Sequence, residues 1–257
     1  MRMVRFLCAA LLVCAAAPAT AQDLFEIQVY PYDTVEPGKT MFEFHTNFIP
    51  SGTHDTGDSQ YANHHQFHET LEITHGWTKR FETGFYVETA HVPGVGEKFT
   101  GFHIRPRFNL PESENVPFKF SLSLEYAWNA EGFDPNSQTL EIRPIFEREQ
   151  GRLYFAFNPS MSLAVKGPDA GSAPGFDPSV KAGWDFSKKV QAGVEYYTET
   201  GTVRHFDPFG DEHHIVFGVA DLNVSPDWEI NFGVGRGITH TSEHWIVKSI
   251  IGYRFKR

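Results

Sequence analysis

Cysteine is almost absent from this chain of 257 residues, which has two, Cys8 and Cys14, both within the first 21 positions. If those positions are removed by cleavage, the remaining chain has no cysteine. A disulfide framework, a thiolate zinc site and a cysteine nucleophile are therefore excluded from the mature protein.

An excess of positive charge is also absent. The chain has 22 Lys and Arg against 32 Asp and Glu, which gives a formal net charge of -10. Nucleic-acid binding needs a basic surface that releases counterions from phosphates. We therefore expect no nucleic-acid partner.

Long apolar runs are missing except at the N-terminus. There, an apolar stretch over residues 6–17 follows Arg2 and Arg5 and precedes a small-residue cleavage signal, Ala19-Thr20-Ala21. This pattern predicts a cleaved secretory signal peptide at residues 1–21. About a dozen apolar residues are too few to cross ~30 Å of hydrocarbon as an anchor, and Val13 is too large beside Cys14 for a lipoprotein signal.

Aromatic residues, by contrast, are abundant: they make up 15% of the chain, with 24 Phe. In residues 118–128, apolar side chains from Phe118 to Trp128 occupy every second position and alternate with residues such as Lys119 and Glu125. A period of two indicates β-strands with two unlike faces. Segments of about ten such residues are longer than the ~5–6 residues usual in soluble sheets. They are typical of strands that cross a membrane in a β-barrel.

Twelve such strands can be assigned, and their connections mostly alternate between tight turns and longer loops. An even number places both ends of the barrel on one side of the membrane, and closure leaves no sheet edge exposed to lipid. The sequence therefore predicts an all-β fold, a closed antiparallel transmembrane β-barrel of about 12 strands. The predicted strands cover residues 40–49, 66–77, 81–90, 99–109, 117–128, 138–148, 152–165, 176–186, 190–201, 213–224, 228–238 and 245–255.

Some predicted strands depart from simple alternation. Pro106 and Pro144 each remove a backbone donor from a strand, so we predict β-bulges at both positions. Residues 213–224 carry apolar side chains on both faces, which suggests that Ile215, Phe217 and Val219 face a plug in the lumen. The five tryptophans lie near strand ends and predict aromatic girdles at the two interfaces.

The C-terminal segment, residues 245–257, resembles the terminal strand of bacterial outer-membrane β-barrel proteins. Phe255, Tyr253, Ile251 and Val247 carry the match, and the departure is that two basic residues follow the aromatic residue. The resemblance implies an outer-membrane location, with Phe255 and Tyr253 as an assembly signal. It also implies contacts with outer-membrane lipid, with lipopolysaccharide and, during biogenesis, with the barrel-assembly machinery.

No linker or low-complexity segment divides the chain, so we expect one domain after the signal peptide. Residues 40–257 are predicted to form the outer-membrane barrel. Residues 22–39 precede the first predicted strand, and we expect them to be an N-terminal periplasmic segment or an extra strand.

Polar side chains on the inward face define the predicted lumen. They either line a narrow channel for small polar or ionic solutes, or pair with one another and close a structural or binding barrel. Twelve strands lie between the filled 8-stranded barrels and the open 16-stranded porins, so both hypotheses remain open. The predicted lumen-lining residues are Glu43, His45, Glu72, Glu82, Glu88, His103, Arg105, Arg107, Lys119, Glu125, Glu141, Arg143, Glu147, Lys181, Asp185, Glu195 and Glu229.

All but His75 of the 13 histidines lie in predicted outer loops or in the outer halves of predicted strands, which suggests a second hypothesis. Imidazole with carboxylate is a good ligand set for a divalent transition metal, which could be captured at a histidine-rich extracellular mouth. The alternative is that these are solvated loop residues whose acidic neighbours help to hold divalent cations between lipopolysaccharide phosphates. No cofactor is expected. The speculative metal ligands are His64, His65, His68, His205, Asp207, His213 and His214.

A lipid hydrolase is the third function considered, because Ser242, Glu243 and His244 are adjacent. Catalysis needs the base within hydrogen-bond reach of the nucleophile and a third group that orients the base. Adjacency in a loop does not establish that geometry, and the chain has no G-x-S-x-G motif. We therefore assign no catalytic residue.

Overall fold

Twelve long β-strands build the protein, together with a two-stranded hairpin formed by β10 (Gly201–Thr202) and β11 (His205–Phe206). The computed structural model describes residues 24–54 and 60–256, so the predicted signal peptide lies outside the described residues. Within these ranges, no helix is long and apolar enough to cross a membrane. The long strands are β1 (Lys39–Ser51), β2 (Phe67–Thr78), β3 (Phe81–Val92), β4 (Gly96–Asn109), β5 (Lys119–Asn129), β6 (Gln138–Gln150), β7 (Leu153–Lys166), β8 (Gly175–Ser187), β9 (Val190–Glu199), β12 (His213–Leu222), β13 (Trp228–Gly237) and β14 (Trp245–Lys256).

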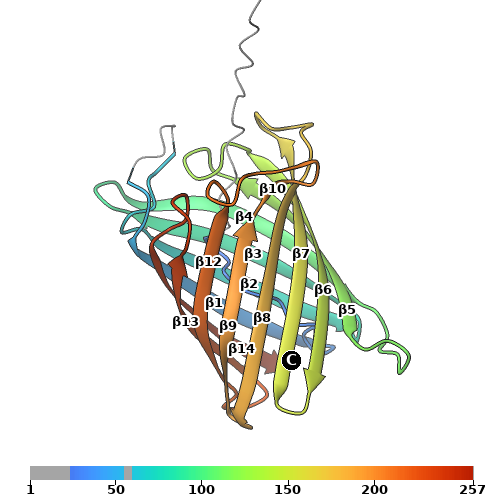
Figure 1. Cartoon of the computed structure of the whole chain (residues 1–257). Helices are drawn as coiled ribbons and strands as arrows, with labels where there is room; N and C mark the ends of the chain where they lie inside the picture. Colours follow the sequence, from blue (N-terminus) through green and yellow to red (C-terminus); the bar gives the residue numbers. More distant parts are fainter. Residues whose placement is uncertain (1–23, 55–59, 257) are drawn as a thin grey trace, which may run out of the picture.

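The long strands form a closed antiparallel barrel (Figure 1). Each pairs with the long strand before and after it in the chain, and β14 pairs back with β1 from Lys39↔Lys256 to Ser51↔Trp245. The predicted fold class is confirmed, and each predicted strand matches an observed one with ends that differ by at most three residues. The alternating pattern was enough to predict the strands because every strand of the ring has the same two environments, lipid on one face and the lumen on the other.

The two ends of the barrel differ. At the end where β1 begins and β14 ends, most connections are tight turns, whereas the connections at the other end are mostly longer (Figure 1). We refer to these as the short-turn end and the long-loop end. Trp77, Trp184 and Trp228 lie near the short-turn end and Trp128 and Trp245 near the long-loop end, all at least partly exposed. This distribution matches the two predicted aromatic girdles.

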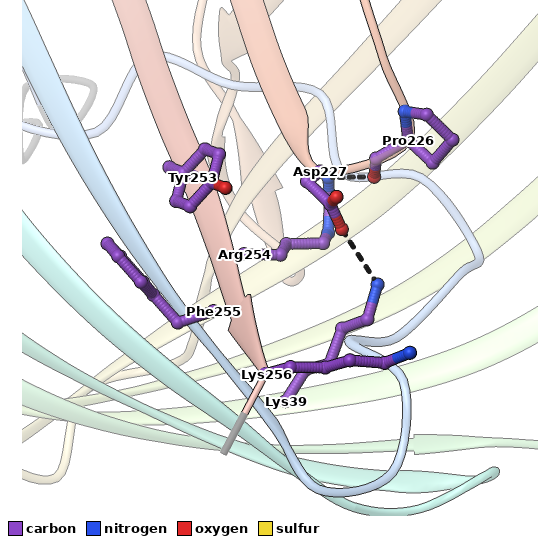
Figure 2. Close-up of a pocket in the computed structure, with 7 residues that line it drawn as sticks. All are labelled: Lys39, Pro226, Asp227, Tyr253, Arg254, Phe255 and Lys256. Carbon is purple, nitrogen blue, oxygen red and sulfur yellow. Dashed lines mark hydrogen bonds and ion pairs between the residues drawn. The ribbon is translucent and has the colours of Figure 1, made fainter.

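The seam between the first and last strands is reinforced at the short-turn end. Lys39 Nζ of β1 lies 2.9 Å from a carboxylate oxygen of Asp227, which directly precedes β13. The backbone N–H of Arg254 in β14 donates to the carbonyl oxygen of Asp227 at 2.8 Å. These residues line a surface hollow of about 490 Å³ at the rim (Figure 2).

The outer wall is apolar and aromatic. In β1, Phe42, Phe44 and Phe48 are 42%, 45% and 36% exposed, while the residues between Phe42 and Phe48 that point inward are buried. Exposed large hydrophobic side chains also occur on β2, β3, β4, β7, β8, β9, β13 and β14, and the outward apolar residues of β5 and β6 are half-exposed. A continuous exposed apolar surface of this kind is the lipid-facing band of a transmembrane barrel.

The predicted bulges at Pro106 and Pro144 are wrong. The ladder around both prolines lacks some pairs but keeps its register: Ile104↔Tyr126 and Arg107↔Ser123 frame the gap at Pro106. Near Pro106 the register shifts instead at Thr100, between Glu88 and Thr89 of the partner strand. A proline lacks only its own N–H, so the wall can lose a local pairing without inserting an extra residue.

Residues 24–38 form no strand, and they do not lie outside the barrel. Leu24, Ile27, Val29, Tyr30, Tyr32 and Val35 are at most 7% exposed, because the segment runs through the lumen. It passes from the long-loop end to Gly38, whose N–H donates to Gly76 O at 2.8 Å. The expectation of a periplasmic segment or extra strand at 22–39 is therefore corrected: residues 24–36 are the luminal segment. All twelve strands already have two neighbours, so the wall offers no edge for another.

Arginine on the outer wall tests the placement of the lipid-facing band. Phe44→Arg puts a charge near the middle of β1 and should lower the free energy of unfolding in phospholipid vesicles by about 2–4 kcal/mol. Phe186→Arg, at the short-turn end of β8, is the matched control and should cost about 0–1 kcal/mol. Equal losses, measured by denaturant titration, would contradict this placement.

Candidate functional site

The structure places all of the predicted lumen-lining residues on the inner face of the wall. Lys119, Glu141, Asp185 and Glu229 are half-buried, and the others are buried. Alternation along each strand produces this arrangement, since every residue that points away from lipid points into the lumen. The buried ones are Glu43, His45, Glu72, Glu82, Glu88, His103, Arg105, Arg107, Glu125, Arg143, Glu147, Lys181 and Glu195.

Arg105 of β4 lies at the centre of the largest ion-pair network. Its guanidinium donates to Glu72, to Glu82 at 3.0 Å and to the Tyr86 hydroxyl. Arg107 pairs with Glu82 at 2.7 Å. Arg105 is 1% exposed and Glu82 is fully buried. Charges buried to this degree are tolerated only when they are paired and hydrogen-bonded.

Other cations form smaller networks around the ring. Lys181 of β8 lies 3.3 Å from Glu195 and 2.8 Å from Asp221, and Lys248 of β14 donates to the same Glu195. On β6, Arg143 pairs with Glu141 at 2.7 Å. The Lys181 and Lys248 network joins β8, β9, β12 and β14, whereas Arg143 and Glu141 both belong to β6, so each cation has a wall carboxylate as its counter-charge.

The wall also binds the backbone of the luminal segment. Asn158 accepts from Tyr30 N at 2.7 Å and donates to Tyr30 O at 3.2 Å. Glu147 accepts from Tyr32 N at 2.8 Å, and Glu82 accepts from Val35 N at 2.6 Å. Wall side chains thus supply the partners that a neighbouring strand would otherwise provide.

Cations bind the carbonyl oxygens of the same segment. Lys248 donates to Ile27 O at 2.9 Å, and Arg107 donates to Pro31 O at 3.2 Å and to Asp33 O at 2.7 Å. The predicted lumen charges therefore have two partners: each other and the backbone of this segment.

Tyr30 is the aromatic anchor of the luminal segment. The guanidinium carbons of Arg143, Arg105 and Arg107 lie 4.3, 5.0 and 5.6 Å from its ring centroid. Its hydroxyl lies 3.2 Å from that of Tyr86. Cation–π contacts of this kind are worth ~0.5–2 kcal/mol each, more when desolvated.

An apolar patch completes the contact on the other side of the lumen. Ile215, Phe217 and Val219 of β12 form one buried cluster with Leu24, Ile27 and Val29 of the luminal segment. Gly235 makes room for Phe217, because a Cβ at that position would lie 2.5 Å from the Phe217 ring. This strand therefore faces a plug, as its two apolar faces predicted.

These contacts close the lumen at mid-height. His45, Arg105 and Lys248, from three different strands, are each 1% exposed, and Phe217 is fully buried. Solvent does not reach them from either end, so the described part of the chain is in a closed conformation.

Solved structures of outer-membrane proteins have a similar fold, whereas no family model and no curated protein sequence matches the chain. An outer membrane channel from Pseudomonas putida F1 aligns over 90% of this chain and 100% of its own, with a TM-score of 0.62 and 10% identity. The NanC porin aligns over 84% and 100%, with a TM-score of 0.57 and 8% identity. The KdgM porin aligns over 84% and 99%, with a TM-score of 0.53 and 13% identity.

The chain has the fold of a bacterial outer-membrane β-barrel. At these identities the likeness concerns the fold alone, and it agrees with the apolar outer wall and the closed ring of strands. The class resemblance drawn from the C-terminal segment is confirmed at this level. Phe255 is 49% exposed on the outer wall and contacts Tyr253 with ring centroids 4.7 Å apart. Their role as an assembly signal stays a prediction.

The seven speculative metal ligands of the outer-membrane barrel do not gather into one site. His64 and His65 stack on each other and His54 lies against His64 with its ring tilted by 36°, and in both pairs the ring centroids are 3.8 Å apart. Desolvation and the neighbouring His54 and His65 lower the pKa of His64. His68 instead points into the lumen, where its ring nitrogens contact Leu24 O and Gln66 Oε1.

The second predicted group is also divided. His214 is buried, and its two ring nitrogens contact the Tyr196 hydroxyl and Glu212 at 2.7 Å each. His205 is exposed in β11 and Asp207 lies just beyond it. Within the described residues, the groups of three close ligands are two luminal clusters that contain none of the predicted seven.

Ser242 is structural in this conformation. It is 2% exposed, and its hydroxyl accepts from His214 N at 2.8 Å and donates to His214 O at 3.1 Å. The nearest partner of His244 is Ser51, 3.5 Å away, and Glu243 accepts from Thr53 N. These contacts hold the outer loops together, and they do not form a nucleophile–base pair.

The luminal residues missed by the sequence argument are those before β1, above all Glu26, Tyr30 and Tyr32. The one signal in the sequence is the alternation of Phe25 and Ile27 with Glu26 and Gln28, which is equally compatible with the two alternatives expected for residues 22–39, a periplasmic segment or an extra strand. The wall side chains bind backbone groups of the luminal segment, and every residue type has such groups. These contacts therefore produce no recognisable pattern in the sequence of the segment.

Removal of Arg105 tests the energetic role of the central network. Arg105→Met leaves Glu72 without its principal cation and should lower the free energy of unfolding by about 3–5 kcal/mol. Adding Glu72→Gln should recover part of the loss. Lys188→Met, an exposed turn residue, is the control and should stay within about 0.5 kcal/mol. A loss for Arg105→Met as small as the control's, in denaturant titration, would show that the network adds no stability.

Proposed function

We propose that this outer-membrane barrel is a narrow channel for small polar or ionic solutes, held closed here by the luminal segment, residues 24–36. The observation that carries the proposal is the nature of the plug. It is an extended chain without a strand partner, bound inside a wall that is charged throughout its middle. If the lumen served stability alone, apolar side chains would fill it equally well or better, because buried ion pairs seldom stabilise a protein more than well-packed hydrophobic residues do.

The contacts of the segment are compatible with its release. They are side-chain-to-backbone hydrogen bonds, each worth only ~0.5–1.5 kcal/mol net, and water could replace them one by one. The backbone ladder of the wall does not depend on them. Displacement would leave an intact barrel with a hydrated, charged lumen.

The similar solved structures support a channel by their names. They are an outer membrane channel from Pseudomonas putida F1, the NanC porin and the KdgM porin. These proteins share the overall fold with this chain, and solute passage is what the comparison suggests for it.

The charge of the wall suggests cation selectivity. Among the predicted lumen-lining residues, carboxylates outnumber Lys and Arg two to one. With the segment displaced, the groups that it neutralises would face water, and the acidic excess would attract cations.

A non-conducting structural barrel is the second candidate. The observation that favours it is the pairing of Arg105, Arg107, Lys181 and Lys248 with wall carboxylates. In that case the luminal segment would be a permanent part of the core, and its removal would expose no conducting path.

Conductance in planar bilayers distinguishes the two functions. The mature chain should show rare steps, and a variant lacking residues 24–36 should show frequent cation-selective steps, because the plug is gone while the wall remains. A variant lacking residues 168–174 in the loop between β7 and β8 is the control and should behave like the mature chain. Heat-modifiable gel migration checks that each variant forms a barrel. A folded 24–36 deletion that seals the bilayer would refute the channel.

A further inference from the structure

Glu26 of the luminal segment meets two wall residues in a buried cluster of metal-ligating side chains. His103 comes from β4 and Glu125 from β5, and one ligand atom from each of the three residues lies within 4.8 Å of the others. Glu26, His103 and Glu125 are 3%, 4% and 7% exposed. None of the contacts that hold the segment in place uses the Glu26 side chain.

Among the residues that the structure describes, the Glu26 carboxylate has no hydrogen-bond partner. Both of its oxygens are buried without one, and so is Oε2 of Glu125. The nearby guanidinium of Arg143 donates to Glu141 and to Ser160 instead. A buried carboxylate oxygen with no partner is costly, and a cation between the Glu26 carboxylate and Oε2 of Glu125 would satisfy both.

His103 supports the same conclusion from the wall side. Its Nδ1 lies 2.6 Å from Glu125 Oε1 and its Nε2 lies 3.3 Å from Glu88 Oε2. A neutral imidazole has one N–H, so it can donate to only one of these acceptors. A metal ion at one ring nitrogen resolves this conflict. The other nitrogen then donates to a carboxylate, the usual way in which proteins orient a ligating histidine.

We propose that Glu26, His103 and Glu125 bind a divalent transition-metal ion, with Glu88 orienting His103. Two carboxylates and one imidazole form a mixed O and N donor set that suits zinc or manganese better than magnesium or calcium, which take oxygen ligands alone. The ion's two positive charges balance carboxylates that the protein's own cations leave without a hydrogen bond.

The site joins the luminal segment to the wall. Its ligands come from both, so the ion stabilises the closed conformation and its loss favours release of the segment. This consequence rests on the proposed channel function, whereas the site itself does not.

The second luminal cluster, Glu43, His45 and Glu72, provides the comparison. There Glu72 already accepts from Arg105 and from Thr74, so the protein supplies the cation. All three residues belong to the wall, and an ion there would not connect the luminal segment.

Zinc binding to the refolded full mature chain tests the site. Equilibrium dialysis against micromolar Zn²⁺ followed by metal analysis should give stoichiometric binding, in a His64→Ala, His65→Ala background that removes the stacked loop histidines. Glu26→Gln and His103→Gln should each weaken binding by more than about tenfold, while Glu43→Gln, the matched luminal control, should leave it unchanged. Heat-modifiable migration confirms that every variant is folded. Absence of zinc binding, unchanged binding in folded Glu26→Gln, or a loss confined to Glu43→Gln would overturn the proposed site.

Conductance measured on the same proteins separates the site from the channel. Zn²⁺ should lower the open probability of the mature chain, a chelator should reverse this, and Glu26→Gln should remove the effect. Zinc binding to a barrel that never conducts would leave the site in place and reject the channel. Conductance without zinc binding would do the reverse.

Discussion

The pairing of β1 with β14 is the constraint on which the rest of the structure depends. Lipid offers no hydrogen-bond partner, so every backbone N–H and C=O within the membrane must be satisfied inside the protein. Closure from Lys39↔Lys256 to Ser51↔Trp245 gives the first and last strands their second neighbour. Once the ring is closed, each side chain of the wall faces either lipid or the lumen, and the apolar side chains cover the lipid-facing surface. Most of the charged side chains of the wall must then share the lumen.

This crowding explains both the ion pairs and the luminal segment. Wall carboxylates and cations pair with each other inside the lumen, as Arg105 of β4 does with Glu72 of β2 and Glu82 of β3. The polar backbone of residues 24–36 then contributes N–H groups to the carboxylates and carbonyl groups to Lys248 and Arg107. The segment is therefore bound through its backbone by groups that would suit a hydrated pore equally well. Gly76 allows its close approach, because a Cβ there would meet Val35 O at 2.1 Å.

The sequence predicted the wall well and its contents poorly. Alternation of lipid-facing and lumen-facing residues repeats along every strand, so the twelve strands and the inward residues from Glu43 to Glu229 could be assigned from local pattern alone. The partners of those residues could not, because Arg105 and Glu72 are 33 residues apart and their meeting depends on register. The luminal segment escaped for a related reason: its position is determined by Asn158, Glu147 and Glu82, which lie far away in the chain. For the histidines, the sequence predicted more clustering than the fold contains. A single metal site was considered from their number and their place in the chain, but His68 and His214 lie at different buried positions.

The direct test of this account is the burial of the luminal segment in the folded barrel. The mature chain lacks cysteine, so Ile27→Cys and Ala170→Cys each introduce a single thiol, the first in the lumen and the second in an exposed loop. Labelling by a water-soluble maleimide should be rapid at position 170 and strongly protected at position 27 until the barrel is unfolded. Equal labelling rates in the folded protein would show that residues 24–36 lie outside the lumen, and would contradict the closed plug.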